Sequence, residues 1–215
     1  MKKINALPTE NQLLIDFIKE NFKMFNPQKD CKELLPGKAG NYVVLLKKET
    51  PLPMEGIVSV PVIRDIEFEG ETYQLIYTGS TSVLQRRIGV NHFGDDTDAG
   101  LSTLRLSLGC LMGFTKIFRD RTENHLRFRS SDEQELTEWM HQNLHILYYE
   151  NTNYKIDEKS IIFALNPPLN ISRNRWKENA AFRSELSYLR KTKETLFEPI
   201  VERHSHEETS GSTPL

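Results

Sequence analysis

Several features that define other protein classes are scarce in this 215-residue sequence. Two cysteines, Cys31 and Cys110, are too few for a disulfide framework, which favours a reducing compartment such as the cytoplasm. No apolar run approaches the length of a membrane span, and the first residues lack the apolar core of a signal peptide. Internal repeats are missing as well. The sequence therefore predicts a cytoplasmic globular protein without a membrane partner.

A strong net charge is also missing, because 28 Lys and Arg residues face 30 Asp and Glu residues, giving a formal net charge of −2. The total does not indicate a nucleic-acid binder, but phosphates respond to local charge. Basic residues are concentrated between Arg86 and Arg129, and again between Arg173 and Lys193. These clusters fit either a basic binding face or ordinary solvated helix surfaces.

Hydrophobic periodicity predicts alternating helices and short strands around one core. Ser102 and Asp157 are the expected caps of two helices, and Tyr73, Leu75 and Tyr77 are expected on one face of a strand. The predicted fold class is α+β, a small antiparallel or mixed sheet flanked by helices, with an added helix at each end of the domain. We expect helices over 9–25, 83–90, 102–113, 131–144, 157–166 and 178–195, and strands over 41–46, 60–68, 72–79, 125–130 and 145–150.

The stretch "LIYTGSTSVLQRRIGVNHF", residues 75–93, contains the first candidate site residues. Tyr77 ends one strand and Tyr42 begins another, so antiparallel pairing would bring the two phenols together. Gly79 lets a ligand or the backbone approach closely. Arg87 lies on the following helix, where its guanidinium can bind a phosphate through two hydrogen bonds, whereas Arg86 is expected on the surface.

Three further candidates lie beyond this helix. Asn91 and His92 follow Arg87 by about one turn, and a histidine there can move a proton near neutral pH. Glu158 falls in the first turn of a predicted helix, and Asn170 follows a double proline. Taken singly, each of these positions also has an ordinary structural explanation, such as a helix-dipole partner or a turn residue.

In order along the chain, "GNYVVL", "LIYTGST", Arg87 and "EKSIIFALNPPLN" resemble the GIY-YIG nuclease superfamily. The segments "STLRLSLGCLMG" and "PPLN" look like those of its stand-alone bacterial members. Asn41 and Thr78 depart from the usual aliphatic residues of the two motifs, and the long separation of the tyrosines implies an insertion at about 47–73. The family's frequent histidine falls on Asn91, with His92 one position later, so the sequence alone leaves open whether Asn91 or His92 serves the site.

The resemblance implies a metal-dependent endonuclease that hydrolyses DNA phosphodiester bonds, of the restriction or the repair type. Glu158 would bind one Mg²⁺ or Mn²⁺ ion per active site. The partners would be double-stranded DNA and, for a palindromic target, a second copy of the chain in a homodimer. The implied catalytic residues are Tyr42, Tyr77, Arg87, His92, Glu158 and Asn170.

Phosphate contacts should come mainly from exposed arginine and lysine side chains. The candidates for binding DNA are Arg86, Arg105, Arg173, Arg175 and Lys177, and Trp176 and Phe182 could stack on bases or belong to the core. The expected organisation is an N-terminal helical extension (1–39), a nuclease domain (40–174), a C-terminal helix (175–200) and a disordered tail (201–215).

Two other functions fit parts of the sequence. A nucleic-acid-binding module could keep this fold without turnover. A zinc protein could use His141 and His145, which have the i, i+4 spacing of ligands on one helical face, although the sequence offers no obvious third ligand.

Overall fold

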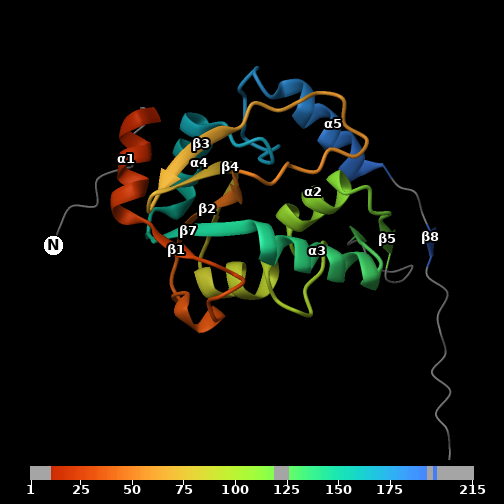
Figure 1. Ribbon diagram of the computed structural model, residues 1–215, viewed down its shortest axis with the longest axis horizontal. Helices are drawn as coiled ribbons and strands as arrows, with labels where there is room; N and C mark the ends of the chain where they lie inside the picture. The colour runs from red at the N-terminus through yellow and green to blue at the C-terminus, as the bar shows by residue number, and fades with distance from the viewer. Residues whose placement is uncertain (1–10, 119–125, 193–195, 198–215) are drawn as a thin grey trace, which may run out of the picture.

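The computed structural model describes residues 11–118, 126–192 and 196–197 (Figure 1). Five antiparallel strands form the central sheet, which confirms the predicted α+β class. Their order is β1 (Lys23–Phe25), β7 (Leu144–Glu150), β2 (Gly40–Lys47), β4 (Glu71–Thr81) and β3 (Arg64–Phe68). The segment 201–215, expected to be a disordered tail, lies outside the described residues.

Helices cover both faces of this sheet (Figure 1). On one face, α1 (Asn11–Asn21) and α4 (Tyr154–Leu165) pack against alternate strand residues such as Val43, Leu45 and Leu147. The other face is covered by η2 (Gln85–His92), α2 (Thr103–Leu111), α3 (Ser130–Asn143) and α5 (Ala180–Lys191). The remaining elements are η1 (Lys32–Leu34) and a small sheet of β5 (Ile117–Phe118), β6 (Leu126–Arg127) and β8 (Leu196–Phe197).

A β-bulge in β4 changes which side chains face the second layer. Val44 pairs with Tyr77 and Leu45 pairs with Leu75, so Ile76 is an extra residue in the strand. The alternation of side chains therefore shifts by one, and Tyr77 packs on the opposite face of the sheet from Leu75. The prediction that these two side chains share a face is wrong, because strict alternation assumes a regular strand.

The predicted insertion forms a hairpin and an extended strap. Strands β3 and β4 pair directly, as expected, through a turn in which Glu69 and Gly70 both have positive φ. The strap, residues 57–63, runs alongside α5 (Figure 1). Asn179, at the start of α5, bonds both the N–H and the carbonyl of Val62, and Glu185 accepts from the N–H groups of Val58 and Ser59.

Several predicted boundaries are corrected. The first helix was expected to reach residue 25 but ends at Asn21, because residues 23–25 instead extend the sheet as β1. The helix α4 begins at Tyr154, so Asp157 lies inside it and is not its cap. Helix α3 ends at Asn143 and His145 lies in β7, which removes the helical spacing on which the zinc hypothesis depended.

Within the described ranges, every helix is too short or too polar to cross a membrane.

Candidate active site

The two tyrosines of the sequence motifs meet at neighbouring ends of β2 and β4. Tyr42 is paired with Gly79, and its ring lies directly over the glycine, because a Cβ at residue 79 would be 2.3 Å from the Tyr42 Oη. After the bulge, Tyr77 projects from the same face, and its ring centroid is 6.3 Å from that of Tyr42. Gly79 is therefore required by the position of the Tyr42 ring.

Arg87, on η2, extends its side chain to the phenols of Tyr42 and Tyr77. Its Nε donates to Tyr42 Oη at 3.4 Å, while Nη1 donates to the carbonyl of Leu101 at 2.9 Å. Burial lowers the pKa of Arg87, but the phenols of Tyr42 and Tyr77 outweigh burial and leave this pKa raised. The neighbouring Arg86 is exposed, as the sequence predicts.

The helix that carries Arg87 is a π-helix, which explains the position of the histidine. Phe93 N–H bonds the carbonyl of Ile88, five residues back, so residues five apart lie on one face. His92, five residues after Arg87, therefore points into the site and is fully buried, whereas Asn91 is only partly buried. Of these two candidates, His92 is therefore the one whose side chain lies against Tyr42.

His92 is held by two hydroxyl groups. Its Nε2 lies 2.8 Å from Tyr42 Oη, and its Nδ1 lies 2.6 Å from Ser102 Oγ. Burial lowers the pKa of His92 well below its usual value, and the charges of Arg87 and Arg105 act in the same direction. The imidazole is therefore neutral at pH 7 and hydrogen-bonded at both nitrogens.

The N-terminus of α2 holds three groups of the site at once. Leu101 accepts the bond from Arg87, and the Thr103 hydroxyl lies 3.2 Å from Tyr77 Oη. Ser102, between them, bonds the histidine and also caps the helix. The sequence predicted Ser102 only as a cap, since no local pattern reveals which distant side chain a capping hydroxyl will meet.

Glu158 approaches the site from α4. Its side chain is 17% exposed, and its Oε2 accepts a 2.9 Å bond from Arg173. Burial is the main cause of a raised pKa at Tyr42, and the negative charge of Glu158 adds to it, which places the carboxylate within electrostatic range of the phenol. In the described part of the chain, no hydrogen bond joins these two side chains.

Asn170 supports the strand between the motif residues. Its side-chain amide bonds both the N–H and the carbonyl of Thr78, each at 2.9 Å, along the part of β4 that β3 does not cover. The Thr78 hydroxyl in turn donates to the carbonyl of Tyr42. Asn170 and Thr78 therefore fix the spacing of the strands that carry the two tyrosines.

The unusual Asn41 of the first motif has a comparable role. Its side chain is fully buried, donates to the carbonyl of Tyr154 and accepts from Asn151, which also donates to Asp157. This network joins the start of β2 to the first turns of α4, the helix that carries Glu158. An aliphatic residue could not make these bonds.

The candidate DNA-binding residues separate into two groups. Arg86, Arg173, Arg175 and Lys177 are exposed. Arg105 is fully buried and paired with Glu133 at 2.7 Å, so the prediction that it contacts DNA is wrong. The guanidinium instead bonds the carbonyl of His92 and the hydroxyl of Thr137, which fixes the backbone next to the site.

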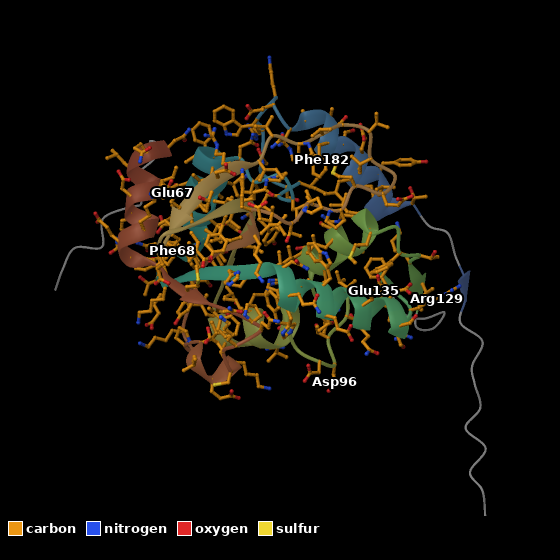
Figure 2. The ribbon with its side chains drawn as sticks, viewed as in Figure 1. Glu67, Phe68, Asp96, Arg129, Glu135 and Phe182 are labelled. Carbon is orange, nitrogen blue, oxygen red and sulfur yellow. The ribbon has the colours of Figure 1, made fainter. Side chains whose placement is uncertain are left out.

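The aromatic and histidine candidates outside the site all make contacts within the protein. Phe182, which Figure 2 labels on α5, is buried in the core and cannot stack on bases, whereas Trp176 is half-buried against Phe163. Both ring nitrogens of His141 face backbone carbonyls. In residues 11–118 and 126–192, no three side chains of His, Cys, Asp or Glu form a group suited to a metal ion.

The family model described as the GIY-YIG catalytic domain matches residues 40–192, well over half of the chain. The chain belongs to this family. GIY-YIG domains are endonuclease domains, so membership supports nuclease activity and a nucleic-acid substrate for this protein. Searches of curated proteins and of solved structures found no match.

Proposed function

We propose that this GIY-YIG protein is a metal-dependent endonuclease that hydrolyses phosphodiester bonds in double-stranded DNA. The observation that carries the proposal is the convergence of Tyr42, Tyr77, Arg87 and His92, from three elements, in one cluster of side chains. Glu158 lies within electrostatic range of that cluster. Grouped ionisable side chains with perturbed pKa values are typical of catalytic sites.

Arg87 would bind the scissile phosphate. Bonds from Nε to Tyr42 and from Nη1 to Leu101 fix its guanidinium beside the two phenols, in position to donate to a phosphate oxygen. Its charge is in place before the substrate arrives, which is the arrangement that stabilises negative charge in a transition state. Tyr77, whose phenol interacts with Arg87, would hold a second phosphate oxygen.

Tyr42 would orient the attacking water and receive its proton. Burial, as the main cause, raises the pKa of Tyr42 far above its ordinary value, while Arg87 acts to lower it. The phenol is therefore protonated at neutral pH in the free protein. Additional positive charge near the site would favour the phenolate.

The residues of the site suit a single hard divalent cation. In the described ranges, Glu158 Oε1 makes no protein hydrogen bond, and Mg²⁺ is commonly held by one or two carboxylates together with water and substrate phosphates. Glu158 would hold the Mg²⁺ or Mn²⁺ ion, one per site. When bound, the ion would act as a Lewis acid and stabilise the leaving 3′-oxygen.

Arg173, Arg175 and Lys177 would contact the DNA backbone next to the catalytic cluster. The pairing of Arg173 with Glu158 connects this basic segment to the metal ligand. The insertion at 47–73 is a candidate for target recognition or for contacts in a homodimer, in either a restriction or a repair enzyme. Both cysteines are free thiols, which is consistent with the cytoplasm.

The second candidate function is a DNA-binding module without turnover. A plasmid-nicking assay with Mg²⁺, with Mn²⁺ and with EDTA separates the two functions. Cleavage that requires the metal supports the endonuclease. Salt-sensitive DNA binding without nicking under any condition would contradict the proposed chemistry and favour the binding module.

A further inference from the structure

One face of α4 exposes apolar side chains to solvent. The exposed residues of this helix are Lys155, Ile156, Lys159 and Phe163, whose spacings of three, four and seven residues place them on one side. Ile156 is 66% exposed and Phe163 is 64% exposed. Single exposed apolar residues are common, whereas adjacent apolar side chains with a polar rim indicate a binding surface.

An aromatic side chain from the segment after α4 extends this face. The ring centroids of Trp176 and Phe163 are 6.0 Å apart, the two planes are tilted by 42°, and Trp176 Nε1 donates to the carbonyl of Phe163. The backbone of Trp176 is fixed as well, because its N–H bonds the side chain of Asn174 and its carbonyl accepts from Arg183. Trp176 is therefore held against α4, where it is half-buried.

Basic side chains lie next to the two rings. In the segment 173–177, Asn174 is buried and Trp176 is half-buried, while the alternate residues Arg173, Arg175 and Lys177 are exposed. The lysines of α4 add to this charge. The exposed cations of the two segments are Lys155, Lys159, Arg173, Arg175 and Lys177.

The carboxylates of the same two segments offset little of this charge. Asp157 is buried, and Glu158 is paired with Arg173. Glu178 accepts a hydrogen bond from Asn166. The exposed charge beside the aromatic rings is therefore mainly positive, and charge complementarity favours a polyanion as the partner of this face.

A single-stranded nucleic acid has the chemistry that fits both features. Its phosphates match the cations, and its unpaired bases can stack on aromatic rings. In a duplex the faces of the bases are covered by their neighbours, so a base can stack on Phe163 only where the strand is unpaired. Arg173 donates to Glu158 at 2.9 Å, so a strand bound here lies beside the proposed metal ligand.

We propose that the exposed face of α4, together with Trp176 and the basic residues of 173–177, binds a single-stranded segment of DNA next to the cleavage site. Phe163 and Trp176 stack on bases, and the lysine and arginine side chains contact phosphates. The substrate is then a duplex that carries an unpaired extension. This last step rests on the proposed nuclease function, whereas the binding of single-stranded DNA does not.

Binding can be measured without cleavage, by fluorescence anisotropy of a labelled oligodeoxythymidine in EDTA. Phe163→Leu should weaken binding about tenfold, because leucine is apolar but cannot stack on a base, and Phe163→Trp should bind like the wild type. Tyr188→Leu, which removes a 70% exposed ring from α5, is the matched control and should leave the affinity unchanged. Equal affinities of Phe163→Leu and the wild type would overturn the inference.

A second measurement follows Trp176 itself. In a Trp139→Phe variant, Trp176 is the only tryptophan of the sequence. Stacking of a base on its ring should quench its fluorescence as the oligodeoxythymidine is added. Unchanged fluorescence at saturating oligonucleotide would show that the strand binds on another face, and would also overturn the inference.

The outcomes separate this inference from the nuclease proposal. An oligodeoxythymidine extension on a duplex should lower KM about tenfold for the wild type, but not for Phe163→Leu. If the wild type cleaves duplexes with and without the extension at the same KM, the inference is wrong and the nuclease proposal stands. If the wild type binds the oligonucleotide through Phe163 but cleaves neither duplex, the nuclease proposal fails and the binding face is confirmed. Self-association that Phe163→Leu abolishes, without oligonucleotide binding, would assign the face to a second copy of the chain and overturn the inference.

Discussion

At the scale of single residues, the side chains of the candidate site are fixed by neighbours that lie outside the set of proposed catalytic residues. Gly79 leaves room for the Tyr42 ring, and the Leu101 carbonyl holds Arg87. Such supporting contacts reduce the reorganisation that is needed when a substrate binds. The two motif departures, Asn41 and Thr78, belong to this supporting set, because each forms buried hydrogen bonds to the motif strands or to α4.

Arg86 and Arg87 are adjacent on one helix, so alanine variants of the two compare the loss of the same charge at two different positions. Arg87→Ala should lower the cleavage rate by about two to three orders of magnitude, because it removes a fixed charge from the developing phosphate charge. Arg86→Ala removes the same charge from an exposed position on the same helix, so it should change the rate far less. Single-turnover cleavage of one plasmid by both variants measures this difference, and equal decreases in rate would refute the role of Arg87.

The buried His92 predicts how stability depends on pH. The pKa of His92 is lowered in the folded state, mainly by burial, so below the unfolded-state value of about 6.5 the unfolded chain binds a proton more readily. The free energy of unfolding should therefore fall as the pH drops from 7 towards 5. His92→Gln should weaken this dependence in urea titrations, and an unchanged dependence would show that His92 is not buried in the neutral form.

At the scale of elements, two irregularities create the site. The bulge at Ile76 turns Tyr77 towards Tyr42, and the π-helix turns His92 towards the same place as Arg87. Each adds one residue to a regular element, and functional sites often contain such additions. Sequence patterns with a period of 2 or 3.6 residues assume regular strands and helices. They therefore predicted the elements that carry Tyr77 and His92, but not the face of each element on which these side chains lie.

Most elements were predictable because their signals are local. The helix over 103–111 begins after its capping serine, and the hairpin of β3 and β4 follows alternating apolar residues around a glycine turn. Strand β1 was not predictable, because residues 23–25 continue a helical apolar pattern and become a strand only through pairing with β7. The burial of Arg105 was likewise hidden, since its partner Glu133 is distant in sequence.

The strap depends on side chains of α5 and of the residue that precedes it. Asn179→Ala removes two hydrogen bonds to Val62 and should destabilise the protein by about 1–3 kcal/mol while speeding proteolytic cleavage within 57–63. Chemical denaturation and limited proteolysis with mass analysis measure the two effects. Ser184→Ala, at an exposed position of α5, is the control. Unchanged proteolysis of the Asn179 variant would show that other interactions hold the strap.

At the scale of the whole molecule, a net charge of −2 means that DNA affinity must depend on local basic segments. The double variant Arg175→Ala, Lys177→Ala should reduce the slope of log affinity against log salt concentration by about 0.9 for each phosphate that the protein no longer neutralises. Fluorescence anisotropy with a labelled duplex measures the slope. Lys29→Ala, at an exposed position beyond the edge strand β1, is the control and should leave the slope unchanged. An unaltered slope in the double variant would show that Arg175 and Lys177 do not contact the DNA backbone.

The proposed chemistry depends most on Glu158 as the metal-binding carboxylate of a DNA-cleaving site. The most direct test is plasmid nicking in Mg²⁺ by the wild type and by Glu158→Gln, with circular dichroism and DNA affinity measured in parallel. We predict that the variant folds and binds DNA like the wild type but does not cleave. Cleavage by Glu158→Gln at the wild-type rate would contradict this role.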